Sequence, residues 1–278
     1  MKIIPSILAI LFLFSAGQVT SSAQNTNTAT VEPLLVSKAL QDEDCRHWVD
    51  SVMNKLSFKE KVGQLFIYTI APIDTKRNLE LLHEAVETHK VGGLLFSGGK
   101  MQTQVELTNR AQKQAKVPVM ITFDGEWGLA MRLRGTPVFP RNMVLGCIRD
   151  NQLIYEYGSE VARQCRQIGV QVNFAPVADV NINPKNPVIN TRSFGEDPVQ
   201  VADKVIAYAY GLEGGGVLSV CKHFPGHGDT DVDSHKALPV LPFTRERLDS
   251  VELYPFKKAI RAGLGGMMAV SYTHLRAH

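Results

Sequence analysis

The chain has 278 residues, of which 44% are hydrophobic and 21% are charged, and its formal net charge is +3. These values are ordinary for a globular protein and allow one large domain with a complete core. The weak positive charge, without clusters of Lys and Arg interleaved with aromatic residues, argues against a nucleic-acid partner. The four cysteines are widely spaced and form no CxxC pair, which argues against a metal site built on thiols.

The N-terminal residues have the pattern of a secretory signal peptide. Lys2 precedes an apolar run at 3–14, and small residues at 21–23 precede a polar stretch. The apolar run is too short for a stable membrane anchor, and no cysteine stands at the small-residue site to carry a lipid. A buried first helix or strand is the alternative interpretation. We expect a signal peptide at 1–23, a polar linker at 24–36, and export to the bacterial periplasm or the medium.

Apolar runs alternate with amphipathic stretches along the rest of the chain, which predicts a parallel sheet covered by helices. The apolar runs are continuous, as expected for strands that are buried on both faces. Strands are expected at 62–69, 91–96, 117–123, 170–176, 217–221 and 266–270, and helices at 78–89, 104–115, 151–168, 198–212 and 245–262.

This alternation favours a (β/α)8 barrel, with a doubly wound sheet as the alternative. No GxGxxG motif follows a strand, so no dinucleotide cofactor is expected. About six strands are found where a closed barrel needs eight. We therefore expect an incomplete, TIM-barrel-like α/β domain at 37–271, truncated after about six βα units, and leave the tail at 272–278 unassigned.

Charged residues follow three of the expected strands. Asp124 and Arg132 follow the third strand, Arg192 follows the fourth, and Lys222 and His223 end the fifth. The carboxyl ends of parallel barrel strands meet at one mouth, so we expect these side chains to converge there. Such a mixture of charges suits a polyhydroxylated or anionic small molecule, because each hydroxyl needs donors and acceptors.

Several of these residues also have purely structural interpretations. Asp124 could cap the following helix, and Arg192 is equally compatible with ligand binding and with a salt bridge inside its loop. Asp179 is expected to fix its loop through local backbone hydrogen bonds. Glu196 and Asp197 precede a proline and are expected to mark the start of a helix.

Residues 222–235, here called the histidine loop, hold three histidines and three aspartates directly after a buried strand. One interpretation is a metal site, although the spacing matches no short zinc signature. The other is acid/base catalysis by His235, because Asp233 lies two residues away and would share a face with it on an extended segment. A carboxylate beside an imidazole favours its protonated form and so supports proton donation. The residues of the metal alternative are His223, His227, Asp233 and His235.

At this point the sequence resembles glycoside hydrolase family 3, in the N-terminal domain of the bacterial β-N-acetylglucosaminidase (β-N-acetylhexosaminidase) type. The resemblance covers about 56–268, and the histidine loop is its most specific motif. The matching segments are Lys61-Val62-Gly63-Gln64-Leu65-Phe66, Asp124-Gly125-Glu126, Phe174-Ala175-Pro176-Val177-Ala178-Asp179-Val180, Thr191-Arg192-Ser193-Phe194-Gly195 and the run from Lys222-His223-Phe224-Pro225-Gly226-His227-Gly228 to Asp233-Ser234-His235.

The resemblance implies a retaining double displacement without metal or cofactor. It implies an exo-acting enzyme that removes terminal β-linked N-acetylhexosamine from small saccharides such as peptidoglycan fragments. It also implies that His235 is the general acid/base, with Asp233 as its dyad partner, and that the terminal sugar is bound by Asp124, Arg132, Arg192, Lys222 and His223.

Two departures from the family pattern are visible. Gly125-Glu126-Trp127-Gly128-Leu129 stands where many bacterial members have Gln-Glu-Gly-Gly-Arg, and the family's aspartate nucleophile lies on a later strand that has no counterpart here. The tail at 272–278 matches nothing expected after the sixth strand and could be foreign. A phosphorylase of the same family and a non-catalytic sugar-binding fragment are therefore the alternatives.

Overall fold

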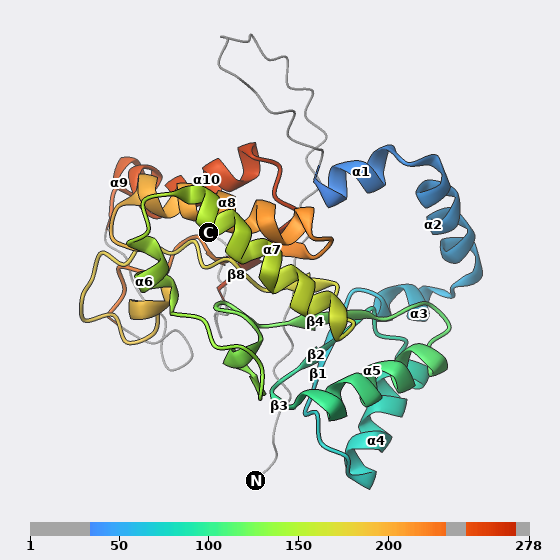
Figure 1. Ribbon diagram of the computed structural model, residues 1–278. Coiled ribbons are helices and arrows are strands. Elements are labelled where there is room, and N and C mark those ends of the chain that lie inside the picture. Colours follow the sequence, from blue (N-terminus) through green and yellow to red (C-terminus); the bar gives the residue numbers. More distant parts are fainter. Residues whose placement is uncertain (1–33, 232–242, 271–278) are drawn as a thin grey trace.

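The computed structural model describes residues 34–231 and 243–270, and its centre is a six-stranded parallel sheet in the order β1-β2-β4-β6-β7-β8 (Figure 1). Each strand pairs with its neighbour in parallel register, for example Ile67 with Gly93 and Val172 with Leu218. The strands are all parallel and stand in chain order across the sheet, as they do in a (β/α)8 barrel. Six strands do not close a barrel of eight, so the sheet is a half-barrel. Its strands are β1 (Ile67–Ile70), β2 (Gly93–Phe96), β4 (Met120–Phe123), β6 (Val172–Asn173), β7 (Leu218–Phe224) and β8 (Gly266–Ala269); a separate pair joins β3 (Gly99–Lys100) to β5 (Leu133–Arg134).

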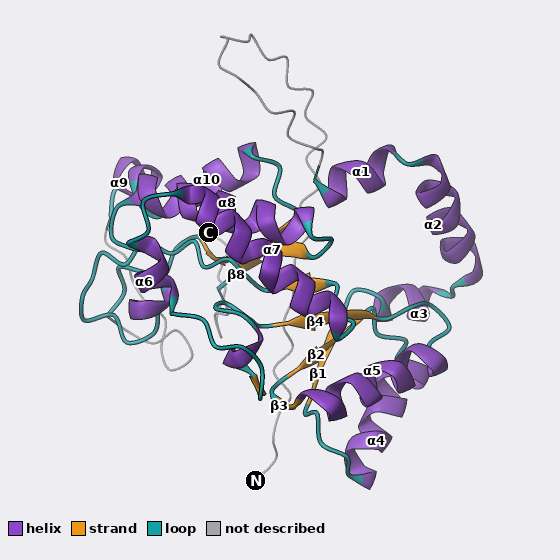
Figure 2. Ribbon diagram, in the orientation of Figure 1, coloured by secondary structure: helices purple, strands orange, loops and turns teal. Residues whose placement is uncertain are grey.

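Helices lie around the outside of the sheet (Figure 2). Those between successive strands include α4 (Lys76–His83), α5 (Met101–Gln114), α7 (Asn151–Gln167), α8 (Pro198–Gly214) and α10 (Tyr254–Arg261). Shorter helices are α3 (Phe58–Gly63), α6 (Asn142–Gly146) and α9 (Arg245–Ser250), with single turns at Glu84–Thr88, Leu129–Met131 and Asn190–Arg192. Two helices, α1 (Leu35–Gln41) and α2 (Glu43–Lys55), precede the sheet.

The strands separate two apolar regions because successive side chains point to opposite faces. On β2, Leu94 belongs to the large core between sheet and helices, whereas Leu95 packs against a smaller cluster on the opposite face. The smaller cluster contains Val172, Val220 and Met268. Burial on both faces explains why the strands read as continuous apolar runs.

Helices α7 and α8 pack closely against each other. A Cβ built on Gly158 would lie 2.4 Å from the Tyr208 carbonyl oxygen, and one on Gly211 would lie 2.2 Å from that of Tyr155. Only glycine allows the two backbones to approach so closely. The apolar face of α7, which includes Ile154 and Cys165, is buried.

The predicted incomplete barrel is confirmed, and each expected strand is present: five are shorter than expected, whereas β7 extends to Phe224, three residues past its predicted end. The first strand was predicted to begin too early, because Ser57 and Glu60 form a capping box that starts α3 and places Val62 in a helix. The single helix expected at 245–262 is two helices, α9 and α10, and α1 and α2 were not predicted. No helix among the described residues is long and apolar enough to cross a membrane; the predicted signal peptide lies outside the described residues.

Candidate active site

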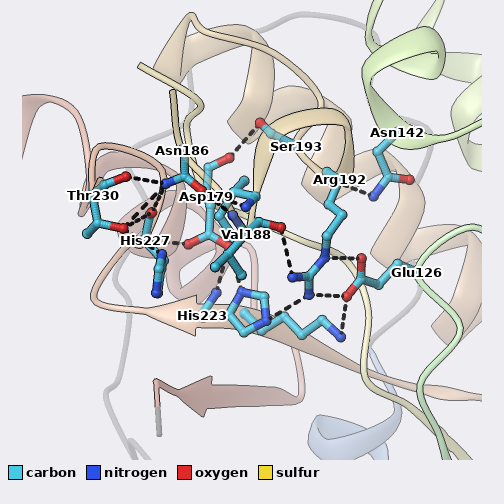
Figure 3. Close-up of polar contacts among 12 residues, drawn as sticks. Glu126, Asn142, Asp179, Asn186, Val188, Arg192, Ser193, His223, His227 and Thr230 are labelled. Carbon is cyan, nitrogen blue, oxygen red and sulfur yellow. Dashed lines mark hydrogen bonds and ion pairs between the residues drawn. The ribbon is translucent and has the colours of Figure 1, made fainter. Parts of the chain in front are cut away.

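Charged side chains from three strands meet at the carboxyl end of the sheet (Figure 3). Asp124 and Glu126 follow β4, Arg192 lies in the long connection after β6, and Lys222 and His223 belong to β7. The predicted convergence is therefore observed. We call Asp124, Glu126, Arg132, Asp179, Arg192, Lys222 and His223 the mouth cluster.

Lys222 joins the two carboxylates that follow β4. Its ammonium group donates to Asp124 Oδ1 and lies 2.8 Å from Glu126 Oε1. Arg132 donates from Nη2 to the second oxygen of Asp124. The Lys222 side chain is only 3% exposed, whereas Asp124 is 21% exposed and remains accessible to a ligand. Asp124 thus holds ion pairs rather than capping a helix.

Glu126 is fully buried and receives Arg192 through two parallel hydrogen bonds. Arg192 Nε lies 2.9 Å from Oε2 and Nη2 lies 2.6 Å from Oε1, while Nη1 donates to the Val188 carbonyl oxygen at 3.2 Å. This bidentate geometry fixes the plane of the guanidinium group. Of the alternatives for Arg192, the salt bridge is present, and it joins the connection after β6 to the segment after β4 rather than lying within one loop.

Electrostatics keep the mouth cluster ionised despite burial. Burial alone would raise the pKa of Glu126, but Lys222 and Arg192 lower it from 4.5 to about 2. Burial likewise opposes ionisation of Asp124, yet Lys222 and Arg132 hold its pKa well below the usual range. Burial would lower the pKa of Lys222, and the two carboxylates outweigh it and raise that pKa. The site therefore carries fixed charges at neutral pH.

Asp179 connects β6 to the histidine loop. This carboxylate is fully buried. Its Oδ2 lies 2.7 Å from His223 Nδ1 and also accepts from the His223 backbone N–H. Its Oδ1 accepts from the His227 backbone N–H at 2.7 Å. The prediction of local hydrogen bonds for the Asp179 side chain was wrong, because the bonds reach another strand end 44 residues away. Asp179 fixes where the histidine loop begins.

Further contacts hold the described part of the histidine loop. Asn186 donates to the carbonyl oxygens of His227 at 2.6 Å and Thr230 at 2.9 Å. Arg247 on α9 donates to Asp229 at 3.0 Å and to both oxygens of Glu252 at 2.7 Å. The loop is thus anchored both to the connection after β6 and to α9.

The mouth cluster contains all five predicted sugar-binding residues, whereas Asp233 and His235 lie outside the described residues. Glu126 was not predicted as a site residue. Its position two residues after Asp124 was the available signal, because side chains two apart on an extended segment share a face. Asp197 starts α8 as predicted and accepts from the backbone N–H groups of residues 199 and 200.

Trp127, which marks the departure from the family pattern, lies beside the mouth cluster in sequence. The guanidinium carbon of Arg141 stands 4.6 Å from the centre of its ring, and Arg141 Nη1 lies 3.4 Å from Thr191 Oγ1. Arg141 thus links this tryptophan to the segment that carries Arg192.

Within residues 34–231 and 243–270, no group of three or more His, Cys, Asp or Glu side chains is arranged to hold a metal ion. Two ligands of the zinc alternative, Asp233 and His235, fall in the gap between these ranges. Cys165 and Cys221 are buried thiols, and Cys147 is exposed.

A carboxylate with fixed cations at the carboxyl ends of parallel strands can bind a hydroxylated ligand, and comparison with known proteins agrees with this chemistry. The pattern of the glycosyl hydrolase family 3 N-terminal domain matches residues 57–277. The chain belongs to glycosyl hydrolase family 3. It is 38% identical over 204 residues to beta-hexosaminidase A of Pseudoalteromonas piscicida, in an alignment that covers 69% of this chain and 34% of that protein. It is 32% identical over 219 residues to beta-hexosaminidase LpqI of Mycobacterium tuberculosis, covering 77% and 54%. This family 3 chain spans about a third to a half of the length of these relatives.

Several solved structures share the fold. A glycoside hydrolase family 3 beta-N-acetylglucosaminidase from Paenibacillus sp. str. FPU-7 superposes with a TM-score of 0.71 at 37% identity, covering 77% of this chain and 42% of that one. NagZ from Neisseria gonorrhoeae, solved with N-trifluoroacetyl-D-glucosamine, has a TM-score of 0.65 at 28% identity, covering 73% and 62%. The beta-glucoside phosphorylase BglX has a TM-score of 0.75 at 25% identity, covering 80% and 40%.

Proposed function

We propose that the protein is an exo-acting, retaining β-N-acetylhexosaminidase that removes terminal β-linked GlcNAc from saccharides such as peptidoglycan fragments. The observation that carries the proposal is the mouth cluster, in which Asp124 is an accessible, ionised acceptor flanked by Lys222 and Arg132. Relatives named beta-hexosaminidase and beta-N-acetylglucosaminidase support the substrate class.

In this proposal the mouth cluster binds the terminal sugar. Asp124 accepts hydrogen bonds from sugar hydroxyls, which is favourable because its pKa is held low and it stays a carboxylate. The contacts of Arg192 to Glu126, Val188 and His223 use four of its five N–H groups, which leaves one for the ligand. Arg132, Lys222 and His223 complete the ring of charged and polar groups around the sugar.

The chemistry follows from the resemblance. His235, oriented by Asp233, donates a proton to the glycosidic oxygen as the bond to the anomeric carbon breaks and the family's aspartate nucleophile forms a glycosyl ester. His235 then removes a proton from the water molecule that attacks this ester and releases the sugar with retained configuration. In the family the nucleophile lies on a strand that comes after the one equivalent to β8.

The decisive experiment replaces His235 in the full-length protein. His235→Ala should reduce turnover of a GlcNAc glycoside with a poor leaving group by about 10²–10⁴-fold, the usual contribution of a positioned acid/base. The loss should be much smaller for an aryl glycoside with a good leaving group, because that group needs little protonation. His89→Ala, at an exposed helix end away from the mouth cluster, is the control. Equal turnover of both substrates by His235→Ala and wild type would refute the assignment.

Phosphorolysis is the second candidate, and the similarity to the beta-glucoside phosphorylase BglX favours testing it. A neutral histidine repels phosphate less than a carboxylate does, so a histidine acid/base is compatible with phosphate as the acceptor. Product analysis decides between the two reactions. A sugar 1-phosphate formed in phosphate buffer identifies a phosphorylase, whereas free sugar with and without phosphate identifies a hydrolase.

Export is also part of the proposal, because residues 1–23 have the pattern of a signal peptide. N-terminal sequencing of the mature protein tests it directly, with Gln24 expected as the first residue. A mature protein that begins at Met1 in the cytoplasmic fraction would contradict export.

A further inference from the structure

We infer that Asp179 is a positioning residue that sets which ring nitrogen of His223 carries the proton and, through His223, holds Arg192 in its binding orientation. The Asp179 side chain is fully buried, so it has no access to a ligand, whereas His223 and Arg192 are each about one-fifth exposed. The inference concerns how the proposed sugar-binding residues are held, and in that respect it rests on the proposed function.

Asp179 can only accept hydrogen bonds. Burial would raise its pKa, but the hydrogen bonds that it accepts from the His223 ring and from the backbone N–H groups of His227 and His223 help to hold that pKa below its usual value. An ionised carboxylate 2.7 Å from His223 Nδ1 requires a proton on that nitrogen. The same oxygen accepts from the backbone N–H of His223, so ring and backbone are fixed together.

The other ring nitrogen faces a group that can only donate. His223 Nε2 lies 3.2 Å from Arg192 Nη2, and a guanidinium group has no acceptor. A hydrogen bond at this distance requires an unprotonated Nε2. These two contacts together place the ring proton on Nδ1 and leave Nε2 to accept from Arg192. Figure 3 shows the His223 ring between Asp179 and Arg192.

Arg192 carries this arrangement onward to Glu126. One Nη2 hydrogen goes to His223, and the other goes to Glu126 Oε1 at 2.6 Å. If the acceptor at His223 became a donor, two N–H groups would face each other and Arg192 would have to move from its bidentate position. The orientation of a binding residue thus depends on a carboxylate that lies behind it.

Asp179→Asn tests this dependence because it preserves shape and removes one acceptor. With its oxygen towards His223, the amide would face the His227 N–H with its own NH₂ group. With the NH₂ group towards His223, it would face the backbone N–H of His223 and force the ring proton onto Nε2, against Arg192. The second arrangement weakens binding of GlcNAc, and we expect a loss of about 10- to 100-fold, the scale of one unsatisfied buried donor.

The primary readout is the long-range ¹H–¹⁵N NMR spectrum of histidine-labelled full-length protein at neutral pH, which shows which ring nitrogen is protonated. We expect Nδ1–H for His223 in the wild type and an Nε2–H population in Asp179→Asn. Asp197→Asn is the matched control, because asparagine caps helix α8 as well as aspartate does. That control should leave both the His223 spectrum and GlcNAc affinity unchanged.

Calorimetry with GlcNAc completes the test through a double-mutant cycle. If Asp179 acts through Arg192, Asp179→Asn should have little further effect on affinity in an Arg192→Met background. Wild-type affinity in Asp179→Asn, or full additivity with Arg192→Met, would overturn the inference. So would a wild-type His223 that is protonated at Nε2, a result that needs no variant to fold. Failure of the wild type to bind GlcNAc would instead refute the proposed function, and the NMR result would stand independently.

Discussion

Replacing Lys222 by Met should destabilise the protein strongly, because this lysine is the cation shared by Asp124 and Glu126. Methionine has a similar length and no charge, so the change removes the ion pairs of Lys222 with both carboxylates. Asp124 and Glu126 keep Arg132 and Arg192 as partners but lie side by side without the cation between them. Removing one partner from a buried ion pair costs about 3–5 kcal/mol. At neutral pH we expect the free energy of unfolding to fall by that amount and the melting temperature to fall by roughly 6–20 °C.

The assay is urea and thermal unfolding followed by circular dichroism, with Lys116→Met as the matched control. Lys116 pairs with Glu60 at 3.2 Å on the surface, where its side chain is 47% exposed, so its loss should cost less than about 1 kcal/mol. Equal stability of the Lys222→Met and Lys116→Met variants would refute the reasoning that the mouth cluster is held by buried, mutually dependent charges.

Two further outcomes follow from the same charges. Asp124→Asn should weaken GlcNAc binding by about 10- to 150-fold, because a charge-assisted acceptor is lost. Isothermal titration calorimetry measures the affinity, with Asp150→Asn at the start of α7 as the control. Unchanged affinity of Asp124→Asn would count against Asp124 as a sugar ligand. Because the folded pKa of Glu126, about 2, lies below its usual value of 4.5, Glu126 contributes stability above pH 4.5 that is lost as the pH falls towards 2. The loss in the free energy of unfolding should approach about 3 kcal/mol. Between pH 5 and about 2, the melting temperature of Glu126→Gln should therefore fall less with decreasing pH than that of the wild type.

The sequence predicts the strands well because burial on both faces produces continuous apolar runs, and it predicts the mouth because parallel strands end at one edge. It fails where the interaction partner is distant. Val62 was assigned to a strand because its neighbours are apolar, but the capping box two to five residues earlier begins a helix there. The helix α2 was not predicted, although Trp48, Val49, Val52 and Met53 recur at helical spacing; none of its residues is buried.

The same holds for the site: residues were predicted where their position after a strand was sufficient, and missed where a partner far along the chain decides their role. Asp124 and Lys222 were predicted to meet because each directly follows or ends a strand. Glu126 was passed over because its partner Arg192 is 66 residues away. Asp179 was assigned local bonds, whereas its partners His223 and His227 are 44 and 48 residues away. Residue spacing reports which strand a side chain follows, but not which of the converging side chains it will contact.

The separation of these partners along the chain has a consequence for folding. The contact between Lys222 and Asp124 closes a span of 98 residues that includes β6 and α7, so the mouth cluster exists only when the sheet from β4 to β7 has assembled. Contacts between distant residues are formed late and slowly. A sugar that binds the mouth cluster therefore binds only the assembled sheet, and saturating sugar should raise the stability of every strand between β4 and β7 together. Hydrogen exchange measured along these strands would report sugar binding at positions that no sugar touches.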